Sequence, residues 1–469
     1  MLDKALVHDV LEAALATGGD FAELFVENNA KNNITMINGV VERAQAGIDY
    51  GAGIRIFNGF NAIYAYTNDT SRDNLIKTAQ TAAKALQKDG RIQVKPFGPL
   101  KVDPIHVYKI LPGDVQKSKI AAMLREAHNG ASGFSSLITQ TNANYSDSVQ
   151  DVLIANSDGL WAEDRRIRTR CGFQAVASGD TEKQDAFTGP GRLSGLEFYD
   201  TINFNELGRK TADIAVTMLK AKLCPGGKMP VVIDNGFGGV ILHEACVHGL
   251  EATSVAKKAS VFADKLGRRI AGDMVTAVDD GTMPNEWGSI NIDDEGNKTR
   301  RNVLIENGIL KTFLIDRLNG LKMNMAATGS SRRESYRYAP TSRMTNTFIS
   351  GGKDTQADII ADTEYGLYAK KMGGGSVNPP TAEFNFAVTE AYMIRNGKIA
   401  EPVRGATLIG KGHEVLLNID RISDNFAMEQ GMCGSLSGSV PTNVGQPMIR
   451  VKELIVGGTY SEDPRARSK

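Results

Sequence analysis

The stretch 32-NNITMINGVVERAQAGIDYGAGIRIFNGFNAIYAYT-67 decides the fold of the N-terminal half, because it alternates apolar and polar residues and contains Asn-Gly twice. An Asn-Gly pair between apolar runs is a strong hairpin signal, since a type I′ turn needs a positive φ at both central residues. We therefore expect antiparallel strands that turn at residues 38–39 and 58–59. The preceding FAELFVEN, at 21–28, shows the same alternation.

Helices and a further hairpin are expected around these strands. The first 18 residues form an amphipathic helical pattern that ends near Gly18. Further helical patterns cover about 70–86, 114–128 and 205–221. Between the last two, residues 150–180 predict a hairpin that turns at Asp158 and Gly159.

The second half of the chain is richer in strand patterns. It opens with an apolar strand at 230–234, a Gly-rich turn at 235–239, a helix, and a second helical stretch at 255–267. Hairpins with Asn-Gly turns follow at 302–316 and 390–403. Helices grouped apart from strands predict an α+β fold, with an N-terminal α/β domain (1–221) and a strand-rich C-terminal domain (229–469). The boundary is expected at 222–228.

Composition excludes several classes of protein. Lys plus Arg and Asp plus Glu both total 54 in 469 residues, and a zero net charge argues against nucleic acid as the main partner. No run approaches the roughly 20 apolar residues of a membrane helix, and the N-terminus lacks the features of a signal peptide. Four unclustered cysteines favour a reducing cytoplasm.

The stretch 241-ILHEACVHGLEA-252 contains a candidate metal motif with unusual spacing. His243 and His248 lie five residues apart, so their side chains diverge by about 140° on an ideal helix, against about 40° for a spacing of four. A π-bulge, or a helix that loosens at Gly249, would let both face one ion with Glu244 beside it. The alternative is a buried helix with no metal.

A catalytic zinc also needs a third protein ligand and an open position for water. Glu251, His413 and Cys433 are all candidates, and spacing alone does not choose among them. Cys433 lies in a Gly-rich stretch that suits a loop ligand. For Cys246 we expect a packing role.

Several motifs in the same order resemble the TldD/PmbA family of peptidases, in its TldD branch. They include 243-HEACVHGLEATSVAKKASVFADKLG-267, 293-DDEGNKTRRNVLIENGILKTFLID-316 and 431-GMCGSLSGSVPTNVGQPMIRV-451. The similarity runs from the N-terminal strands to about residue 455. The family's older label, modulator of DNA gyrase, does not imply DNA binding.

The resemblance implies a zinc metallopeptidase with an H-E-x-x-x-H helix. Carried onto this chain, His243, His248 and Cys433 would bind Zn²⁺ and Glu244 would be the general base. It also implies extended peptide substrates and a dimer, with itself or with a PmbA/TldE-like paralogue. The family pattern has glycine before the second histidine, whereas Val247 stands here, at a cost of about 0.5–1 kcal/mol on helix-propensity scales.

Two other functions compete with this one. The chain could be a TldD-like scaffold that binds peptides or a paralogous partner without cutting them, or it could hold a structural zinc. A structural site usually shows four thiolate or imidazole ligands in tight pairs, and only two are close here. Finally, 331-SRRESYR-337 could bind a substrate carboxylate or a partner, but we expect a solvated charged turn.

Overall fold

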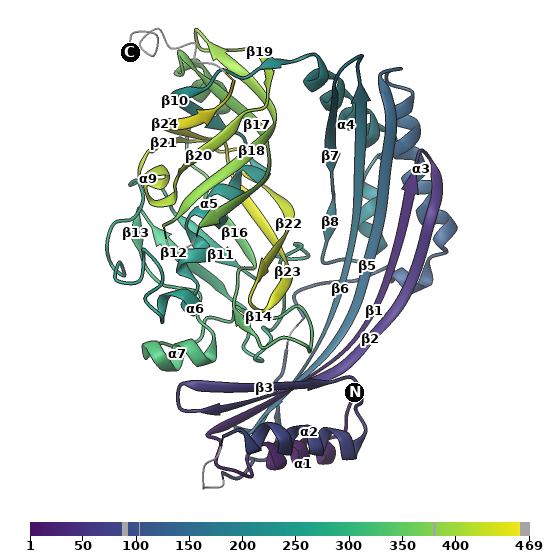
Figure 1. Cartoon of the computed structure of the whole chain (residues 1–469), viewed down its shortest axis with the longest axis vertical. Coiled ribbons are helices and arrows are strands. Elements are labelled where there is room, and N and C mark those ends of the chain that lie inside the picture. Colours follow the sequence, from purple (N-terminus) through teal and green to yellow (C-terminus); the bar gives the residue numbers. More distant parts are fainter. Residues whose placement is uncertain (87–91, 103, 379–380, 460–469) are drawn as a thin grey trace.

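The computed structural model describes residues 1–86, 92–102, 104–378 and 381–459 (Figure 1). The N-terminal half is organised around one sheet, in the order β3-β2-β1-β5-β6-β4, with β7 and β8 both paired to β6. Its strands are Phe21–Ile37 (β1), Val40–Asn58 (β2), Asn61–Thr67 (β3), Gly98–Pro99 (β4), Ile138–Asn156 (β5), Leu160–Ser178 (β6), Lys183–Thr188 (β7) and Gly191–Arg192 (β8).

The hairpin turns follow the local sequence closely. Asn38 and Gly39 have φ of 48° and 79°, as a type I′ turn requires. At the second turn Asn58 is still paired with Asn61, so the turn residues are 59 and 60, one position later than expected. Only Gly59 has a positive φ there (58°), which is the pattern of a type II′ turn. The hairpin of β5 and β6 turns at 157–159, as expected.

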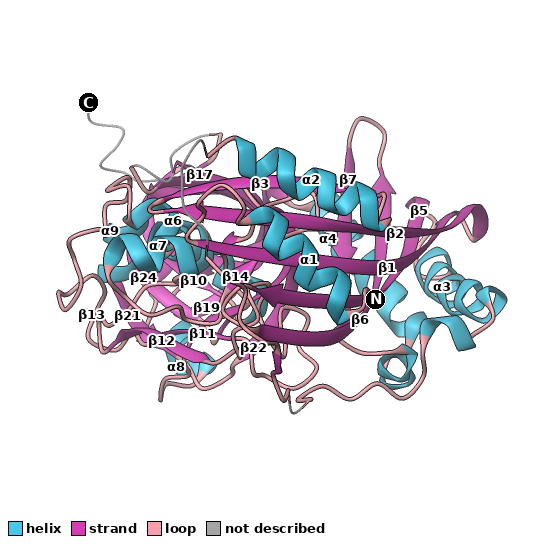
Figure 2. Cartoon of the chain, turned by 90° about the horizontal axis from the view of Figure 1, so that it is seen from below, coloured by secondary structure: helices cyan, strands magenta, loops and turns pink. Residues whose placement is uncertain are grey.

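Four helices cover one face of this sheet at its two ends. They are Lys4–Ala14 (α1), Arg72–Lys84 (α2), Lys117–Ser132 (α3) and Phe204–Lys220 (α4). Side chains of even number on β1 face all four: Leu24 and Val26 pack with α1 and α2, and Ile34 and Met36 pack with α3 and α4. Figure 2 shows α1 and α2 lying across the strands. The other face is left for the C-terminal half.

The C-terminal half contains a closed barrel. Its strands are Lys222–Leu223 (β9), Gly227–Ile233 (β10), Tyr365–Asn378 (β17), Glu383–Arg395 (β18), Lys398–Arg404 (β19), Thr407–Lys411 (β20), Ile419–Ile422 (β21) and Ile449–Gly457 (β24). The order is β17-β10-β24-β20-β18-β19-β9, and β17 also pairs with β18, which closes the ring. The hairpin of β18 and β19 turns at Asn396 and Gly397, both with positive φ.

A third sheet carries part of the candidate site. It has the order β13-β12-β11-β16-β23-β22. Its strands are Ala277–Asp280 (β11), Arg301–Glu306 (β12), Ile309–Leu310 (β13), Asn346–Ile349 (β16), Ala427–Ser435 (β22) and Gly438–Gln446 (β23), and Ser331–Arg332 (β14) pairs separately with Thr341–Ser342 (β15). Helices and strands thus occupy separate parts of the fold, and the α+β prediction is confirmed. The predicted domain boundary at 222–228 stays a prediction.

Short helical pieces connect the sheets. The α-helical pieces are Val240–Ala245 (α5), Ala252–Val255 (α6), Arg317–Met323 (α7), Gln356–Ala361 (α8) and Gly412–Leu417 (α9). The 3-10 turns are Pro112–Asp114 (η1), Leu196–Thr201 (η2), Gly236–Gly239 (η3) and Val247–Leu250 (η4).

The helical prediction for 255–267 is wrong. The helix α6 ends at Val255, turns follow, and Lys258 has a φ of 54°. These turns bury Phe262 against Gly249, where an added Cβ would lie 2.8 Å from the Phe262 ring. Tertiary packing therefore overrides the helical pattern.

Two further features bear on the setting of the protein. Across the described ranges, we find no helix with the length and apolar character needed to cross a membrane. None of the four cysteines forms a disulfide bond, and all four are buried.

Candidate metal centre

The two histidines converge because the helix that carries them breaks between them. Helix α5 ends at Ala245, Cys246 takes φ −130° and ψ −57°, and η4 begins at Val247. The ring centroids of His243 and His248 lie 5.0 Å apart at an interplanar angle of 89°. Neither a π-bulge nor loosening at Gly249 produces this geometry. The break at Cys246 and the tighter 3-10 turn after it do so instead.

Packing explains where the break falls. Cys246 and Val247 are both fully buried in the core of the C-terminal half. Burial raises the pKa of the Cys246 thiol, so this residue stays neutral and packs as a small apolar side chain. The packing role expected for Cys246 agrees with this environment. Val247 is the first residue of η4 and its side chain is buried in the core. It therefore does not have to fit into an uninterrupted α-helix.

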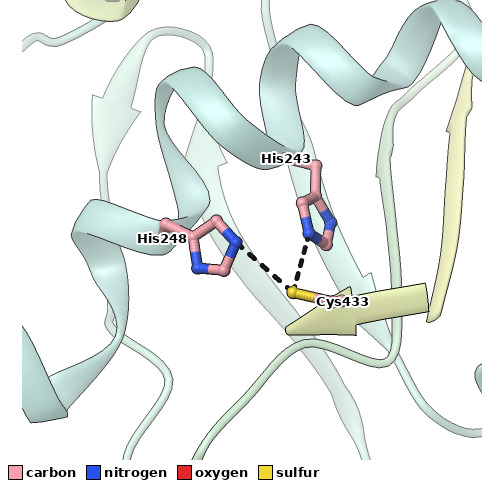
Figure 3. A group of neighbouring side chains, drawn as sticks. All are labelled: His243, His248 and Cys433. Atoms are coloured by element: carbon pink, nitrogen blue, oxygen red, sulfur yellow. Dashed lines mark hydrogen bonds between the residues drawn. The ribbon is translucent and has the colours of Figure 1, made fainter. Parts of the chain in front are cut away.

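The third potential ligand comes from strand β22, far along the chain, and not from a loop as the Gly-rich sequence suggested. The sulfur of Cys433 lies 3.2 Å from Nε2 of His243 and 3.3 Å from Nε2 of His248 (Figure 3). The three candidate ligand atoms all lie within 4.8 Å of one another. His243 and Cys433 are only 3% and 4% exposed. The structure therefore brings together the three residues that the family resemblance selected.

The other candidate ligands lie elsewhere. His413 stands at the start of α9 with a side chain 40% exposed, and its nearest charged partner is Glu414, at 3.9 Å. Glu251 contacts His248 on the opposite side of the ring, with Oε2 3.3 Å from Nδ1. A carboxylate in this position orients a histidine ligand and fixes its tautomer.

Arg343 was not identified from the sequence, yet it links both sides of the centre. Its side chain is fully buried, and its Nε lies 3.6 Å from Oε1 of Glu251. Its Nη2 donates to the Cys433 carbonyl, and its Nη1 donates to the Gly438 carbonyl at 2.8 Å. The guanidinium of Arg343 thus fixes Glu251, the partner of His248, relative to the β22–β23 hairpin. No local pattern marks Arg343, because its partners are distant in the chain.

The electrostatics of the cluster favour a thiolate. Burial opposes ionisation of Cys433, but His243 and His248 outweigh burial and hold the pKa of the thiol at about 3. Burial likewise opposes a charge on His248, but Glu251 and Cys433 raise its pKa well above the ordinary value. Both shifts favour a thiolate at Cys433 and a protonated ring at His248.

The residues present fit zinc. Bonds of about 2.0 Å to nitrogen and 2.3 Å to sulfur in a tetrahedral site place N and S about 3.5 Å apart, close to the separations seen here. Two imidazoles and a thiolate form a three-ligand set of the kind that leaves one position open in catalytic sites. Glu244 borders the cluster, with Oε2 3.6 Å from Nε2 of His248 and a side chain 24% exposed.

Comparisons with known proteins place this geometry in a family. Models described as PmbA/TldA metallopeptidase domain 1, central domain and C-terminal domain match residues 22–86, 110–219 and 226–458. A metalloprotease TldD homologue of Buchnera aphidicola is 34% identical, over 94% of this chain and 93% of that protein. A zinc metalloprotease TldD homologue of Saccharolobus solfataricus is 26% identical, over 96% of this chain and 99% of that protein.

A solved structure shares the fold. A protein of Thermotoga maritima, described as a modulator of a DNA gyrase, superposes with a TM-score of 0.78. The comparison covers 93% of this chain and 96% of that one at 19% identity, so it speaks for the fold alone. With three family models matched in order and a curated relative at 34% identity over nearly its whole length, this chain belongs to the PmbA/TldD family of metallopeptidases.

Proposed function

We propose that the protein is a zinc-dependent peptidase that hydrolyses peptide bonds in unfolded or extended peptides. The observation that carries this proposal is the convergence of His243, His248 and Cys433, with Glu244 at the margin of the cluster. The metalloprotease names of its relatives support the reaction class, and one of them names zinc.

Each residue of the centre has a distinct role in this proposal. His243, His248 and Cys433 would hold the zinc, which, when bound, polarises a carbonyl and lowers the pKa of water to about 7. Glu244 takes a proton from the attacking water at its carboxylate and later gives it to the leaving amine. Glu251 keeps Nδ1 of His248 engaged, so Nε2 stays free to bind metal.

The position of β22 supports an extended substrate. This strand carries Cys433 and lies at the end of the strand order of its sheet. An extended peptide that pairs with a sheet edge is held by main-chain hydrogen bonds, which do not depend on its sequence. A peptide paired along β22 would bring its backbone beside the ligand cysteine.

The setting of the enzyme is part of the proposal. We infer a dimer with a second copy or with a PmbA/TldE-like paralogue, as the family resemblance implies. Four cysteines without a disulfide bond favour a reducing compartment, the cytoplasm. The balanced charge gives no basis for nucleic acid as a partner.

Zinc content per chain, in the wild type and in Cys433→Ala, tests the centre. We expect about one zinc in the wild type and little in the variant. Cys246→Ala is the matched control, because this buried thiol neighbours the site without facing the other ligand atoms, and it should keep its zinc.

Digestion of an unfolded protein, with and without chelator, separates an enzyme from a scaffold. Loss of digestion on chelation and its return with zinc support the peptidase. A wild type that binds zinc but never cleaves would favour the non-catalytic scaffold that binds peptides or a paralogous partner.

A further inference from the structure

A row of arginines on β6 faces a cavity between the two halves of the molecule. Alternate residues of a strand point to the same face, so Arg166, Arg168 and Arg170 all turn away from the helices α3 and α4. They line a cavity of about 820 Å³ together with Arg332 and Arg333 of the C-terminal half. Both of the latter are only 4% exposed, so the expectation of a solvated charged turn at 331–337 is wrong for them.

Two of these arginines are neutralised by buried carboxylates. Arg166 pairs with Asp164 at 3.1 Å and with Asp294 at 2.7 Å. Arg333 pairs with Glu23 at 2.7 Å. These charges are satisfied within the protein, and they hold the first sheet to the C-terminal half.

The remaining three have no acidic partner among the residues that the structure describes. Arg168 donates to the carbonyls of Trp287 and Ser289 at 3.0 and 2.8 Å, through Nε and Nη2. Arg332 donates Nη1 alone, to the carbonyls of Met344 and Pro441, both at 2.6 Å. Arg170 reaches the Gln430 carbonyl at 3.4 Å.

The charges of these arginines are costly where they stand. Arg168 is 8% exposed and Arg332 is 4% exposed. Burial, and then the neighbouring Arg166, lowers the pKa of Arg168 to about 10. Burial, and then Arg168, lowers the pKa of Arg332 to about 9. Both remain protonated at neutral pH, so an anion that enters the cavity would relieve their mutual repulsion.

The other side chains that line the cavity suit a peptide that carries a carboxylate better than they suit a polyanion. Six cationic and three acidic side chains line the cavity. The facing strands add carboxamides that can bond a peptide backbone: Asn29, Asn32, Asn33, Asn144 and Gln150. Met432 also lines the cavity, and it immediately precedes Cys433 on β22. The cavity and the metal centre therefore lie on opposite faces of the same edge strand.

We propose that Arg168, Arg170 and Arg332 form a subsite that binds a carboxylate of the peptide substrate. This inference rests on the proposed peptidase function and adds a substrate preference to it. Guanidinium groups bind carboxylates through paired charge-assisted hydrogen bonds, and the unused nitrogens of Arg168 and Arg332 supply the donors. The carboxylate is either the free C-terminus of the peptide or an Asp or Glu side chain.

Binding of three fluorescein-labelled peptides of one sequence tests the subsite. The first has one Glu and an amidated C-terminus, the second has Gln and a free C-terminus, and the third has Gln and an amidated C-terminus. Anisotropy is measured on the full chain carrying Glu244→Gln, so that the peptides stay intact. We expect one or both carboxylate peptides to bind at least about tenfold more tightly than the neutral one. Which one does so identifies the source of the carboxylate.

Variants assign the preference to the arginines. Arg332→Gln should reduce the preference for carboxylate peptides to less than about twofold. Arg170→Gln should do the same, and because Arg170 is less buried than Arg332 it keeps the test valid if the first variant misfolds. Arg209→Gln is the control, because this exposed arginine on α4 pairs with Glu206 and should leave the preference intact. Equal or absent binding of the three peptides, or a preference that survives both variants, overturns the subsite. Tighter binding of oligothymidylate than of the acidic peptides overturns it as well.

Cleavage of the same peptides by the wild type separates the two proposals. Selective binding without cleavage would refute the peptidase and leave the subsite standing. Cleavage with no preference among the peptides would refute the subsite and leave the peptidase standing.

Discussion

The first sheet and the candidate metal centre are built in opposite ways. Strands β1, β2, β5 and β6 run for 17 to 19 residues and pair almost continuously along their length. The centre is assembled from α5, η4 and α6, pieces of four to six residues, and from one edge strand. Long regular elements fix large surfaces, whereas a broken helix can aim two side chains at one point. The long strands serve as a scaffold, and the short pieces position the side chains of the candidate site.

The largest effect should come from a variant at the candidate metal centre. Glu244→Gln removes the group that takes the proton, so turnover should fall by roughly 10²–10⁴-fold. Zinc content and the melting temperature should stay near the wild-type values, because Glu244 is at the margin of the cluster. The measurement is steady-state cleavage of an unfolded protein together with elemental analysis. Activity within twofold of wild type would remove Glu244 from the mechanism.

A variant at the contact between the first sheet and the C-terminal half should lower stability without changing the candidate metal centre. Arg55 is 2% exposed and binds Glu23 and Glu295 at 2.8 and 2.7 Å, from the first sheet and the C-terminal half. Arg55→Met removes the arginine that binds Glu295 and one of the two arginines that bind Glu23, and it should lower the free energy of unfolding by about 3–5 kcal/mol. Chemical denaturation measures the loss, and Arg209→Met, which opens an exposed ion pair, should leave the unfolding midpoint unchanged. An equal shift in both variants would contradict this account of the contact.

A third variant should distinguish a metal ligand from a residue that only orients a ligand. Glu251→Gln keeps the shape at Nδ1 of His248 but removes the charge that orients the ring. Zinc affinity should fall by about 10–100-fold, as is typical when a carboxylate partner of a histidine ligand is lost. Competition with a chromophoric chelator measures this affinity. If the affinity fell as far as in His248→Ala, Glu251 would have to be counted as a ligand.

The smallest effect concerns a buried acid on the first sheet. Burial, the largest cause, raises the pKa of Glu27 from 4.5 to about 7, although Gln150 donates to it at 2.9 Å. The folded protein therefore binds the proton more tightly than the unfolded chain does. Stability from this group is complete below pH 4.5 and is lost as the pH rises through about 7. Glu27→Gln should stabilise the protein by about 1–2 kcal/mol at pH 8.5 and change little at pH 4.5. Thermal unfolding at both pH values checks the sign.

Local signals explain what the sequence could predict. The Asn-Gly pairs at 38–39 and 396–397 form turns because only a few residues tolerate their positive φ. The helices α1 to α4 follow apolar periodicity, and Asp3 and Asn203 cap two of them. Such features depend on neighbours within a few residues.

Long-range contacts explain what it could not predict. The helix break falls at Cys246 because the core surrounds it, and no pattern in the motif shows that. Arg333 is buried and binds Glu23, which lies 310 residues earlier in the chain. No local pattern could have shown this contact. Reasoning from the residues alone left Glu251, His413 and Cys433 open as third ligand. Family resemblance selected Cys433, and the structure brings it to the two histidines.

The distance between the candidate ligands along the chain has a consequence for biosynthesis. Cys433 follows His248 by 185 residues. At 5–20 residues per second, a ribosome needs about 10–40 s to make that interval. During this time the nascent chain carries both histidines without the thiolate and without the β22 edge beside it. The candidate metal site can therefore form only after β22 has been made, and a chain that stops short of β22 lacks one of the three candidate ligands.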